Sequence, residues 1–264
     1  MGECVKSDGG VCYTIMNNIF PSALHPYLEG VKAIDSSGRS VASTLYLDNG
    51  YYLKMAPKGT LADEAKFTKW FHEKGLSVEV VLYLSDDKDY LLTRKAEGEV
   101  LTNCLNRPID VCKTLATGLL RLHSFPISDF PVTDKLDVYI QTAEENYRRG
   151  CFTKDYLLPW IDFANRDEAW QVFQAHKHLL QPVVVVHGDY CLPNVLMKNG
   201  EFSGMIDLGQ AGVANRHIDL YWALWSLCYN LGTDAYTHIF LDFYGRHQVN
   251  LDLLRTIAAI ETFV

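Results

Sequence analysis

One stretch of the chain, residues 183–209, places two carboxylates and a carboxamide at a spacing that suits a cation. It reads VVVVHGDYCLPNVLMKNGEFSGMIDLG, in which Asp189 lies five residues before Asn194. Asn199-Gly200 predicts a hairpin turn, and the return strand ends at Asp207. Hard oxygen ligands brought together in this way suit Mg²⁺ with a phosphate as a further ligand. We expect Asn194 and Asp207 to hold the metal, which leaves Asp189 free to act as a base.

The order of these residues is more specific than any one of them. His187-Gly188-Asp189 alone is compatible with a tight turn that an aspartate caps. Asp-Leu-Gly alone carries even less information. The succession of H-G-D-x-x-x-x-N, a hairpin and I-D-L-G indicates a catalytic arrangement.

The segment from about residue 30 to 100 has strand-like patterning around one helix. Asp48-Asn49-Gly50 lies between two β-rich runs and is a strong hairpin signal. The helix ends at Gly75, a typical residue just past a helix C-terminus. These features predict a compact, mostly antiparallel β-β-α-β-β segment. Its expected elements are strands over 41–47, 51–55, 78–84 and 90–93 and a helix over 61–74.

After Gly98 the patterning becomes helical, apart from the stretch 183–209. Apolar residues at helical spacing predict amphipathic helices over 110–123, 136–149, 168–180, 218–231 and 237–244. The expected fold class is therefore α+β. We predict a small N-terminal lobe (1–97), a linker at about 94–98 and a larger helical C-terminal lobe (98–264). A cleft between two lobes is a usual place for a small-molecule site.

The composition argues against several classes of protein. The 264 residues carry a net charge of −8 without a block of Lys and Arg, which argues against nucleic acid as a partner. No apolar stretch is long enough to span a membrane, and the N-terminus MGECVKSDGG lacks the apolar region of a signal peptide. The seven cysteines include no C-x-x-C pair, which argues against a disulfide framework and a zinc site. We expect a cytoplasmic protein.

The order of motifs in 183–209 resembles the catalytic and metal loops of the eukaryotic-type protein-kinase fold. More narrowly, HGDYCLPNVLMKNGEFSGMIDLGQAGVANRHIDL (187–220) resembles the aminoglycoside phosphotransferase family, and within it the 3′-phosphotransferases. The chain length fits that family, as does a C-terminal helix ending in Glu-Thr-Phe-Val (261–264). The resemblance implies a two-lobed, protein-kinase-like fold with a β-rich N-terminal lobe.

The resemblance also implies roles for five residues of the reaction centre. Asp189 would orient, and deprotonate, the attacking hydroxyl. Asn194 and Asp207 would hold Mg²⁺ against the nucleotide phosphates. Lys54 matches the lysine that contacts the α- and β-phosphates, and Glu64 matches the helix glutamate that pairs with it. An ammonium fixed by a carboxylate is a preorganised phosphate clamp.

Other positions are implied to support the nucleotide and the catalytic loop. Backbone groups of the linker, at Arg94 and Ala96, would meet the adenine, and Ser40 would cap the β-phosphate. Asp219 matches an aspartate that braces the catalytic loop, and His187 is expected to pack within that loop.

The acceptor implied by the resemblance is a polycation, whose site needs converging carboxylates. The candidates are Asp155, Asp162, Glu261 and the terminal carboxylate of Val264. The chain departs from the family pattern at three positions. Thr262 stands where family members carry a second acid, and Gln210 and Trp225 stand where they carry arginines.

The implied activity is Mg²⁺-dependent transfer of the γ-phosphoryl group of ATP or GTP to a hydroxyl, the 3′-hydroxyl, of an aminoglycoside antibiotic, which confers resistance. Two alternatives stay open: a kinase of another small alcohol (choline, a sugar or another antibiotic) and a nucleotide-binding pseudokinase without turnover. A metal phosphohydrolase usually needs more His and Asp ligands than lie here. The expected partners are a nucleoside triphosphate and a cationic small molecule, with no nucleic acid and no membrane, and the chain is expected to be a monomer or a weak dimer.

Overall fold

The computed structural model describes residues 5–7, 10–14, 20–37, 42–132 and 134–263. The chain divides into two compact units, unit 1 (Met1–Ala96) and unit 2 (Glu97–Val264). This division lies one residue from the boundary that the sequence predicts. Unit 1 is built mainly from strands and unit 2 mainly from helices, so the fold class is α+β as predicted.

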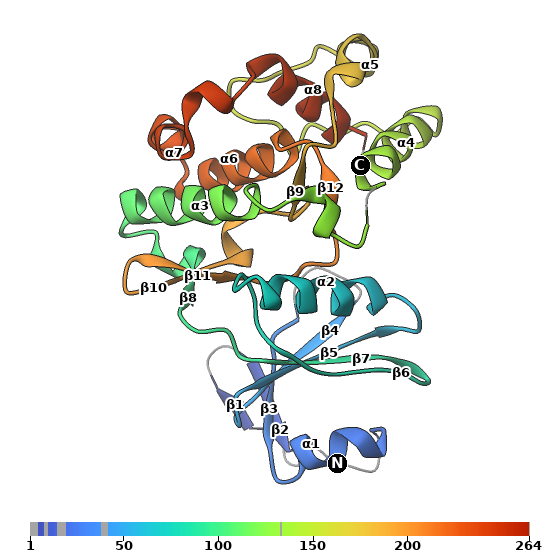
Figure 1. Ribbon diagram of the computed structural model, residues 1–264, viewed down its shortest axis with the longest axis vertical. Coiled ribbons are helices and arrows are strands. Elements are labelled where there is room, and N and C mark those ends of the chain that lie inside the picture. The colour runs from blue at the N-terminus through green and yellow to red at the C-terminus, as the bar shows by residue number, and fades with distance from the viewer. Residues whose placement is uncertain (1–4, 8–9, 15–19, 38–41, 133, 264) are drawn as a thin grey trace. The chain divides into compact units, whose positions relative to one another are not determined.

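Unit 1 is an antiparallel sheet with one long helix. Within its described residues the sheet has seven strands in the order β1-β2-β3-β4-β5-β7-β6 (Figure 1). Its strands are β1 (Val5–Ser7), β2 (Gly10–Thr14), β3 (Lys32–Asp35), β4 (Ser43–Leu47), β5 (Tyr51–Pro57), β6 (Val80–Ser85) and β7 (Lys88–Arg94), and its helices are α1 (His25–Leu28) and α2 (Ala62–Glu73).

The alternation of side chains along β5 decides which residues meet helix α2. Leu53 is fully buried among apolar residues of α1 and the neighbouring strands, whereas Ala56 packs against Leu61 and Ala65 at the start of α2. Because successive strand residues point to opposite faces, Lys54 shares the α2 face with Ala56. The sheet thereby brings a lysine to the helix that carries Glu64.

The turn and helix signals of unit 1 are confirmed. Tyr46 and Leu47 of β4 pair with Tyr52 and Tyr51 of β5 across the predicted hairpin, and Gly50 has a positive φ of 89°. Helix α2 ends just before Gly75, as the sequence predicts. Gly75 has a positive φ of 69°, and its N–H bonds to the His72 carbonyl at 2.9 Å. Glycine reaches this left-handed region without a steric cost.

Unit 2 places helix α6 between α3 and α8 (Figure 1). Its described helices are α3 (Pro108–Leu122), α4 (Lys135–Arg148), α5 (Arg166–His176), α6 (His217–Leu231), α7 (Thr237–Tyr244) and α8 (Leu251–Glu261). Its described strands are β8 (Glu99–Val100), β9 (Val184–Val186), β10 (Val195–Lys198), β11 (Glu201–Met205) and β12 (Gly212–Ala214), which form the small sheets β11-β10-β8 and β12-β9.

Each helix expected in this unit is present, with bounds shifted by a few residues. The largest shift is in the helix predicted over 168–180, because α5 begins at Arg166 and ends at His176. Its start is set by Asn165, whose side chain accepts hydrogen bonds from the N–H groups of Asp167 and Glu168. The segment Lys177–Leu179 continues as a 3₁₀ turn.

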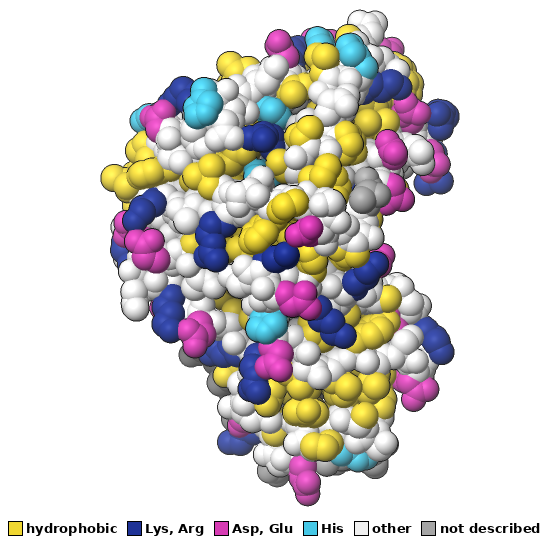
Figure 2. All heavy atoms as spheres, viewed as in Figure 1, with side chains coloured by type: hydrophobic (Ala, Val, Ile, Leu, Met, Phe, Trp, Pro, Cys, Tyr) yellow, Lys and Arg dark blue, Asp and Glu magenta, His cyan; other side chains and the backbone are white. Residues whose placement is uncertain are grey.

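The distribution of surface charge and the length of the helices were compared with what nucleic acid or a membrane would need. On the face drawn in Figure 2, Lys and Arg side chains are interspersed with Asp and Glu and form no single basic patch. Within the described ranges, no helix is long and apolar enough to cross a bilayer.

Candidate active site

The loop that carries Asp189 begins where strand β9 ends. Val184, Val185 and Val186 are buried and pair with β12, and the chain then turns through His187 and Gly188. Gly188 has φ 84°, and a Cβ on it would lie 2.1 Å from the carbonyl oxygen of Gln210. Only glycine fits this position, because both its conformation and its close approach to another backbone exclude a side chain.

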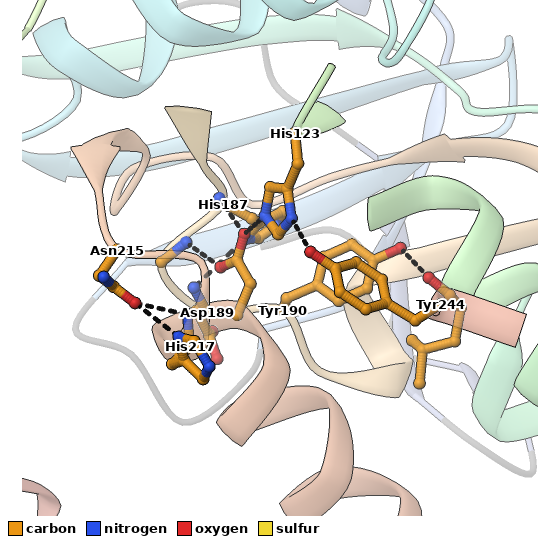
Figure 3. Close-up of polar contacts among 10 residues, drawn as sticks. His123, His187, Asp189, Tyr190, Asn215, His217 and Tyr244 are labelled. Atoms are coloured by element: carbon orange, nitrogen blue, oxygen red, sulfur yellow. Dashed lines mark hydrogen bonds and ion pairs between the residues drawn. The ribbon is translucent and has the colours of Figure 1, made fainter. Parts of the chain in front are cut away.

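Asp219 braces this turn, as the resemblance predicts. It is fully buried at the start of α6, and its carboxylate accepts hydrogen bonds from the N–H groups of His187 and Gly188, each at 2.9 Å. A third donor is Nε2 of His123, at 3.2 Å. Figure 3 shows the His123 ring pointing also toward the hydroxyl of Tyr244, at 2.8 Å from Nδ1.

The hydrogen bonds of His187 confirm that it packs in the loop. Its Nε2 lies 2.9 Å from the Ile206 carbonyl, which can only accept, so Nε2 carries the proton. Its Nδ1 then accepts from the N–H of Asp189 at 3.3 Å. Both nitrogens of this fully buried ring are therefore used inside the protein, and none is left to transfer a proton.

Asp189 and Asn194 are in direct contact. The amide nitrogen Nδ2 of Asn194 donates to Oδ2 of Asp189 and to the Asp189 carbonyl, each at 3.0 Å. Because its nitrogen is engaged in this way, Asn194 can offer a cation only its oxygen Oδ1. A 3₁₀ turn over Leu192–Asn194 closes the loop and sets this orientation.

The hairpin β10–β11 brings Asp207 beside Asn194. Val195 pairs with Met205, and the N–H of Ile206 bonds to the Asn194 carbonyl at 2.9 Å. The predicted turn is confirmed, with positive φ at Asn199 (55°) and Gly200 (81°). Asp207 itself is exposed and has φ 61°, which is uncommon for a residue other than glycine. Uncommon backbone angles of this kind gather at functional sites.

The donor set fits a magnesium ion that arrives with a nucleotide. Asn194 and Asp207 supply a carbonyl oxygen and a carboxylate from adjacent strand ends, which are the hard ligands that Mg²⁺ prefers. Among the described residues, no three His, Cys, Asp or Glu side chains are grouped so as to hold a metal alone. Phosphate oxygens would have to complete the coordination.

Lys54 and Glu64 form the expected pair within unit 1. The Lys54 ammonium lies 2.9 and 2.8 Å from the two carboxylate oxygens of Glu64. The side chains are 17% and 10% exposed, so solvent screens the pair only weakly. A cation held by both oxygens of one carboxylate has little freedom to move before it meets a phosphate.

The linker residues are partly used by the sheet. The N–H of Arg94 bonds to the Glu79 carbonyl at 3.0 Å, and the N–H of Lys95 bonds to the Gly50 carbonyl at 2.9 Å. The Arg94 side chain is exposed and pairs with Glu79 at 2.6 Å. These two N–H groups are already engaged, whereas no hydrogen bond of the Ala96 N–H to another backbone group is found among the described residues. Ser40 lies outside the described residues.

Among the acids expected to meet a cationic acceptor, Asp155 and Asp162 are exposed and Glu261 is buried. Asp162 accepts from Lys154 at 2.7 Å, and this hydrogen bond lowers its pKa. The segment that carries both aspartates lies against the C-terminal turn, since the N–H of Thr153 bonds to the Thr262 carbonyl at 2.8 Å. Val264 lies outside the described residues.

Glu261 is a buried carboxyl at the end of α8. It is 2% exposed, accepts from the Tyr139 hydroxyl at 2.5 Å and is also hydrogen-bonded by Trp222. Burial is the largest cause that raises its pKa, the negative charge of Asp189 also raises it, and the hydrogen bonds and Lys135 lower it, so that the pKa is about 7. This group therefore changes charge near neutral pH and is sensitive to the charge of Asp189.

The structure shows what the side chain contacts at each of the three positions that depart from the family pattern. The Thr262 hydroxyl is buried and donates to the Ala259 carbonyl at 2.7 Å, so it faces its own helix. Gln210 accepts from Lys135 at 2.7 Å. Trp225 lies in a cluster of aromatic rings, stacked on Tyr229 with centroids 5.0 Å apart. Lys135 and Tyr139 were missed, because nothing in the periodicity of α4 distinguishes a residue that faces the site from one that faces solvent.

Comparison with known proteins identifies the family of this chain. A model of the phosphotransferase enzyme family, APH, matches residues 33–255. The chain belongs to this family. The family resemblance that the sequence predicts is thus confirmed, and the chain is a phosphotransferase.

Its relatives include a probable aminoglycoside 3′-phosphotransferase of Lactococcus lactis, 39% identical over 92% of this chain and 95% of the relative. An aminoglycoside 3′-phosphotransferase of Niallia circulans is 30% identical over 80% of this chain and 83% of the relative. The phosphotransferase fold is shared with a Streptomyces rimosus aminoglycoside phosphotransferase solved with ADP and streptomycin, at a TM-score of 0.71 and 19% identity, over 94% and 99% of the two chains.

Replacing Glu261 with glutamine is expected to change how stability depends on pH. The folded pKa of about 7 is above the ordinary value of 4.5, so the stability that this carboxyl contributes is present below about 4.5 and is lost as the pH rises through about 7. The loss in the free energy of unfolding over this pH range is roughly 3 kcal/mol. In thermal unfolding between about pH 5 and 8, the melting temperature of Glu261→Gln should rise relative to that of the unchanged protein as the pH rises.

His217 contributes in the opposite direction, because burial lowers its pKa to about 4. This contribution is the same in both proteins, so it cancels when the stability of Glu261→Gln is compared with that of the unchanged protein at each pH. A difference that stays constant across this range would mean that Glu261 is ionised throughout.

Proposed function

We propose that the chain transfers the γ-phosphoryl group of ATP or GTP to the 3′-hydroxyl of an aminoglycoside, with Mg²⁺, and so confers resistance to the antibiotic. The observation that carries the proposal is the contact between Asn194 Nδ2 and Asp189 Oδ2, which orients the carboxylate and leaves the amide oxygen Oδ1 as the group that could bind a metal. The names of the relatives support the acceptor class. A protein of this kind would act in the cytoplasm, where nucleoside triphosphates are available.

In the proposed reaction Asp189 accepts a hydrogen bond from the attacking hydroxyl and aligns it with the γ-phosphorus. It takes the hydroxyl proton as the new P–O bond forms and the bond from the γ-phosphorus to the leaving nucleoside diphosphate breaks. Asn194 and Asp207 would hold the metal, which when bound would supply positive charge against the phosphate oxygens. Lys54, fixed by Glu64, neutralises charge on the α- and β-phosphates. We propose a kinase-like fold in which Ser40 and the backbone of Ala96 are further contacts of the nucleotide. Adding phosphate to the antibiotic cancels positive charge that the drug needs to bind RNA.

For the acceptor, we propose that Glu261, Asp155, Asp162 and the terminal carboxylate of Val264 meet the ammonium groups. Glu261 would bind an ammonium in its ionised form, which a pKa of about 7 leaves only partly populated at neutral pH. The inward-facing Thr262 hydroxyl and the aromatic position of Trp225 reduce the charge on this side. These two observations favour, as second candidate, a kinase of a less charged alcohol.

Lys54→Met is expected to lower kcat/KM for the nucleotide by about 10²-fold, because a preorganised cation on the phosphates is lost. Glu64→Gln should lower it by about 10-fold, since the lysine stays but is less well fixed. Steady-state turnover with varied nucleotide measures both. Lys88→Met, at an exposed strand position of the same sheet, is the matched control and should change kcat/KM less than about twofold. Equal kinetics for Lys54→Met and Lys88→Met would contradict the phosphate role.

The experiment that tests the proposed function is nucleotide turnover with Mg²⁺ across a panel of acceptors. The panel contains kanamycin, neomycin-type and gentamicin-type aminoglycosides, choline and simple sugars. Stimulation by aminoglycosides alone supports the proposal. Stimulation by choline or a sugar alone supports the second candidate, and nucleotide binding without stimulation by any acceptor indicates a pseudokinase.

A further inference from the structure

Lys135, the first residue of α4, reaches the segment that follows the metal residue Asp207. Its ammonium donates to Oε1 of Gln210 at 2.7 Å. Its aliphatic carbons lie on Gly212, where an added Cβ would be 2.3 Å from the Lys135 Cβ and 2.8 Å from its Cγ. Glycine at 212 is thus what lets the lysine lie flat on strand β12.

Gln210 contacts the catalytic loop on its other side. Its backbone carbonyl is so close to Gly188 that a Cβ there would lie 2.1 Å from the oxygen. The N–H of Gly188 is held by Asp219, and Asp189 is the next residue. A chain of contacts therefore runs from Lys135 through Gln210 to the residue before Asp189.

The start of α4 has a second attachment to the same strand, because the N–H of Val213 bonds to the Val132 carbonyl at 3.1 Å. Burial lowers the pKa of Lys135, whereas the carboxylates of Asp219 and Glu261 favour its charged form. Both acids therefore lie close enough to Lys135 to act on its charge.

We propose that Lys135 is a positioning residue for phosphoryl transfer: by holding Gln210 against Gly188, it sets the spacing between the metal residue Asp207 and the base Asp189. The inference rests on the proposed function, because that function gives these two aspartates their roles. We expect loss of this contact to lower kcat, because a displacement of about 1 Å at a reacting group can cost as much as 10²-fold in rate.

Lys135→Met is expected to lower kcat by about 10- to 100-fold, with KM for nucleotide and acceptor changed less than about threefold. Lys135→Arg keeps a donor for Gln210 and should stay within about threefold of the unchanged protein. Gln210→Leu should repeat the loss of Lys135→Met. The double variant should be no slower than either single one, because both substitutions remove the same contact. Lys113→Met, which removes an exposed pair with Glu201, is the control and should leave kcat unchanged.

Hydrogen exchange gives a readout that does not depend on the acceptor. Peptides covering 207–213 and 187–189 should exchange faster in Lys135→Met, while α6 keeps its protection. The proposal is overturned if kcat is unchanged, if the two losses multiply, if Lys135→Arg is as slow as Lys135→Met, or if exchange in these peptides is unaltered. Should no aminoglycoside stimulate turnover, the proposed function fails by itself, and the same variants are compared in transfer to the best acceptor of the panel or to water.

Discussion

Asp219→Ala is expected to destabilise unit 2 by about 3–5 kcal/mol and to abolish measurable turnover. The carboxylate is fully buried and accepts from two backbone N–H groups and from His123. Removing it leaves these donors buried without an acceptor, and each such group costs about 1–3 kcal/mol. The loop that they hold contains Asp189, so activity is lost together with stability.

Chemical denaturation followed by circular dichroism measures the loss in stability. Asp219→Asn keeps one oxygen acceptor and should lie between the alanine variant and the unchanged protein. Asp242→Ala is the matched control, since this exposed aspartate of α7 pairs with Arg246 just past the end of the helix and should cost less than about 1 kcal/mol. A cost for Asp219→Ala no larger than that of the control would contradict the bracing role.

Asp189→Asn is expected to lower kcat by about 10²- to 10⁴-fold while the fold and nucleotide binding are retained. An asparagine is nearly the same size, and its oxygen can still accept from Asn194 Nδ2, where Asp189 Oδ2 now lies. Its nitrogen then faces the acceptor, where it can donate a hydrogen bond but can neither align nor deprotonate a hydroxyl.

Steady-state turnover gives kcat, and titration calorimetry with nucleotide and Mg²⁺ shows whether binding persists. Asp134→Asn, a substitution of the same chemistry at an exposed residue before α4, is the control. If Asp189→Asn keeps more than about a tenth of the kcat of the unchanged protein, Asp189 is not the base.

The elements that position the site could be predicted because their signals are local. The turn at Asn199-Gly200 needs two consecutive residues at positive φ, and this pair supplies them. The end of α2 at Gly75 follows the same logic. The strands β8 and β12 carry no such signal, because two or three residues show no periodicity and become strands only by pairing with β10 and β9.

The site residues that could be predicted lie close together in the sequence, and those that were missed are brought together only by packing. Asp189, Asn194 and Asp207 lie within one contiguous motif, so their order already indicates their grouping. Lys135 is 75 residues away from Gln210 along the chain, and only the packing of α4 on Gly212 brings the two together. The burial of Glu261 likewise depends on Tyr139 and Trp222, which come from other helices.

The central claim is that this site phosphorylates the 3′-hydroxyl of an aminoglycoside, and phosphorus–proton NMR of the product tests it most directly. Kanamycin and an analogue that lacks only the 3′-hydroxyl are each incubated with the protein, nucleotide and Mg²⁺. We expect a phosphate coupled to the proton on carbon 3′ of kanamycin, and no product from the analogue. Phosphate on another carbon, or equal turnover of the analogue, would contradict the claim.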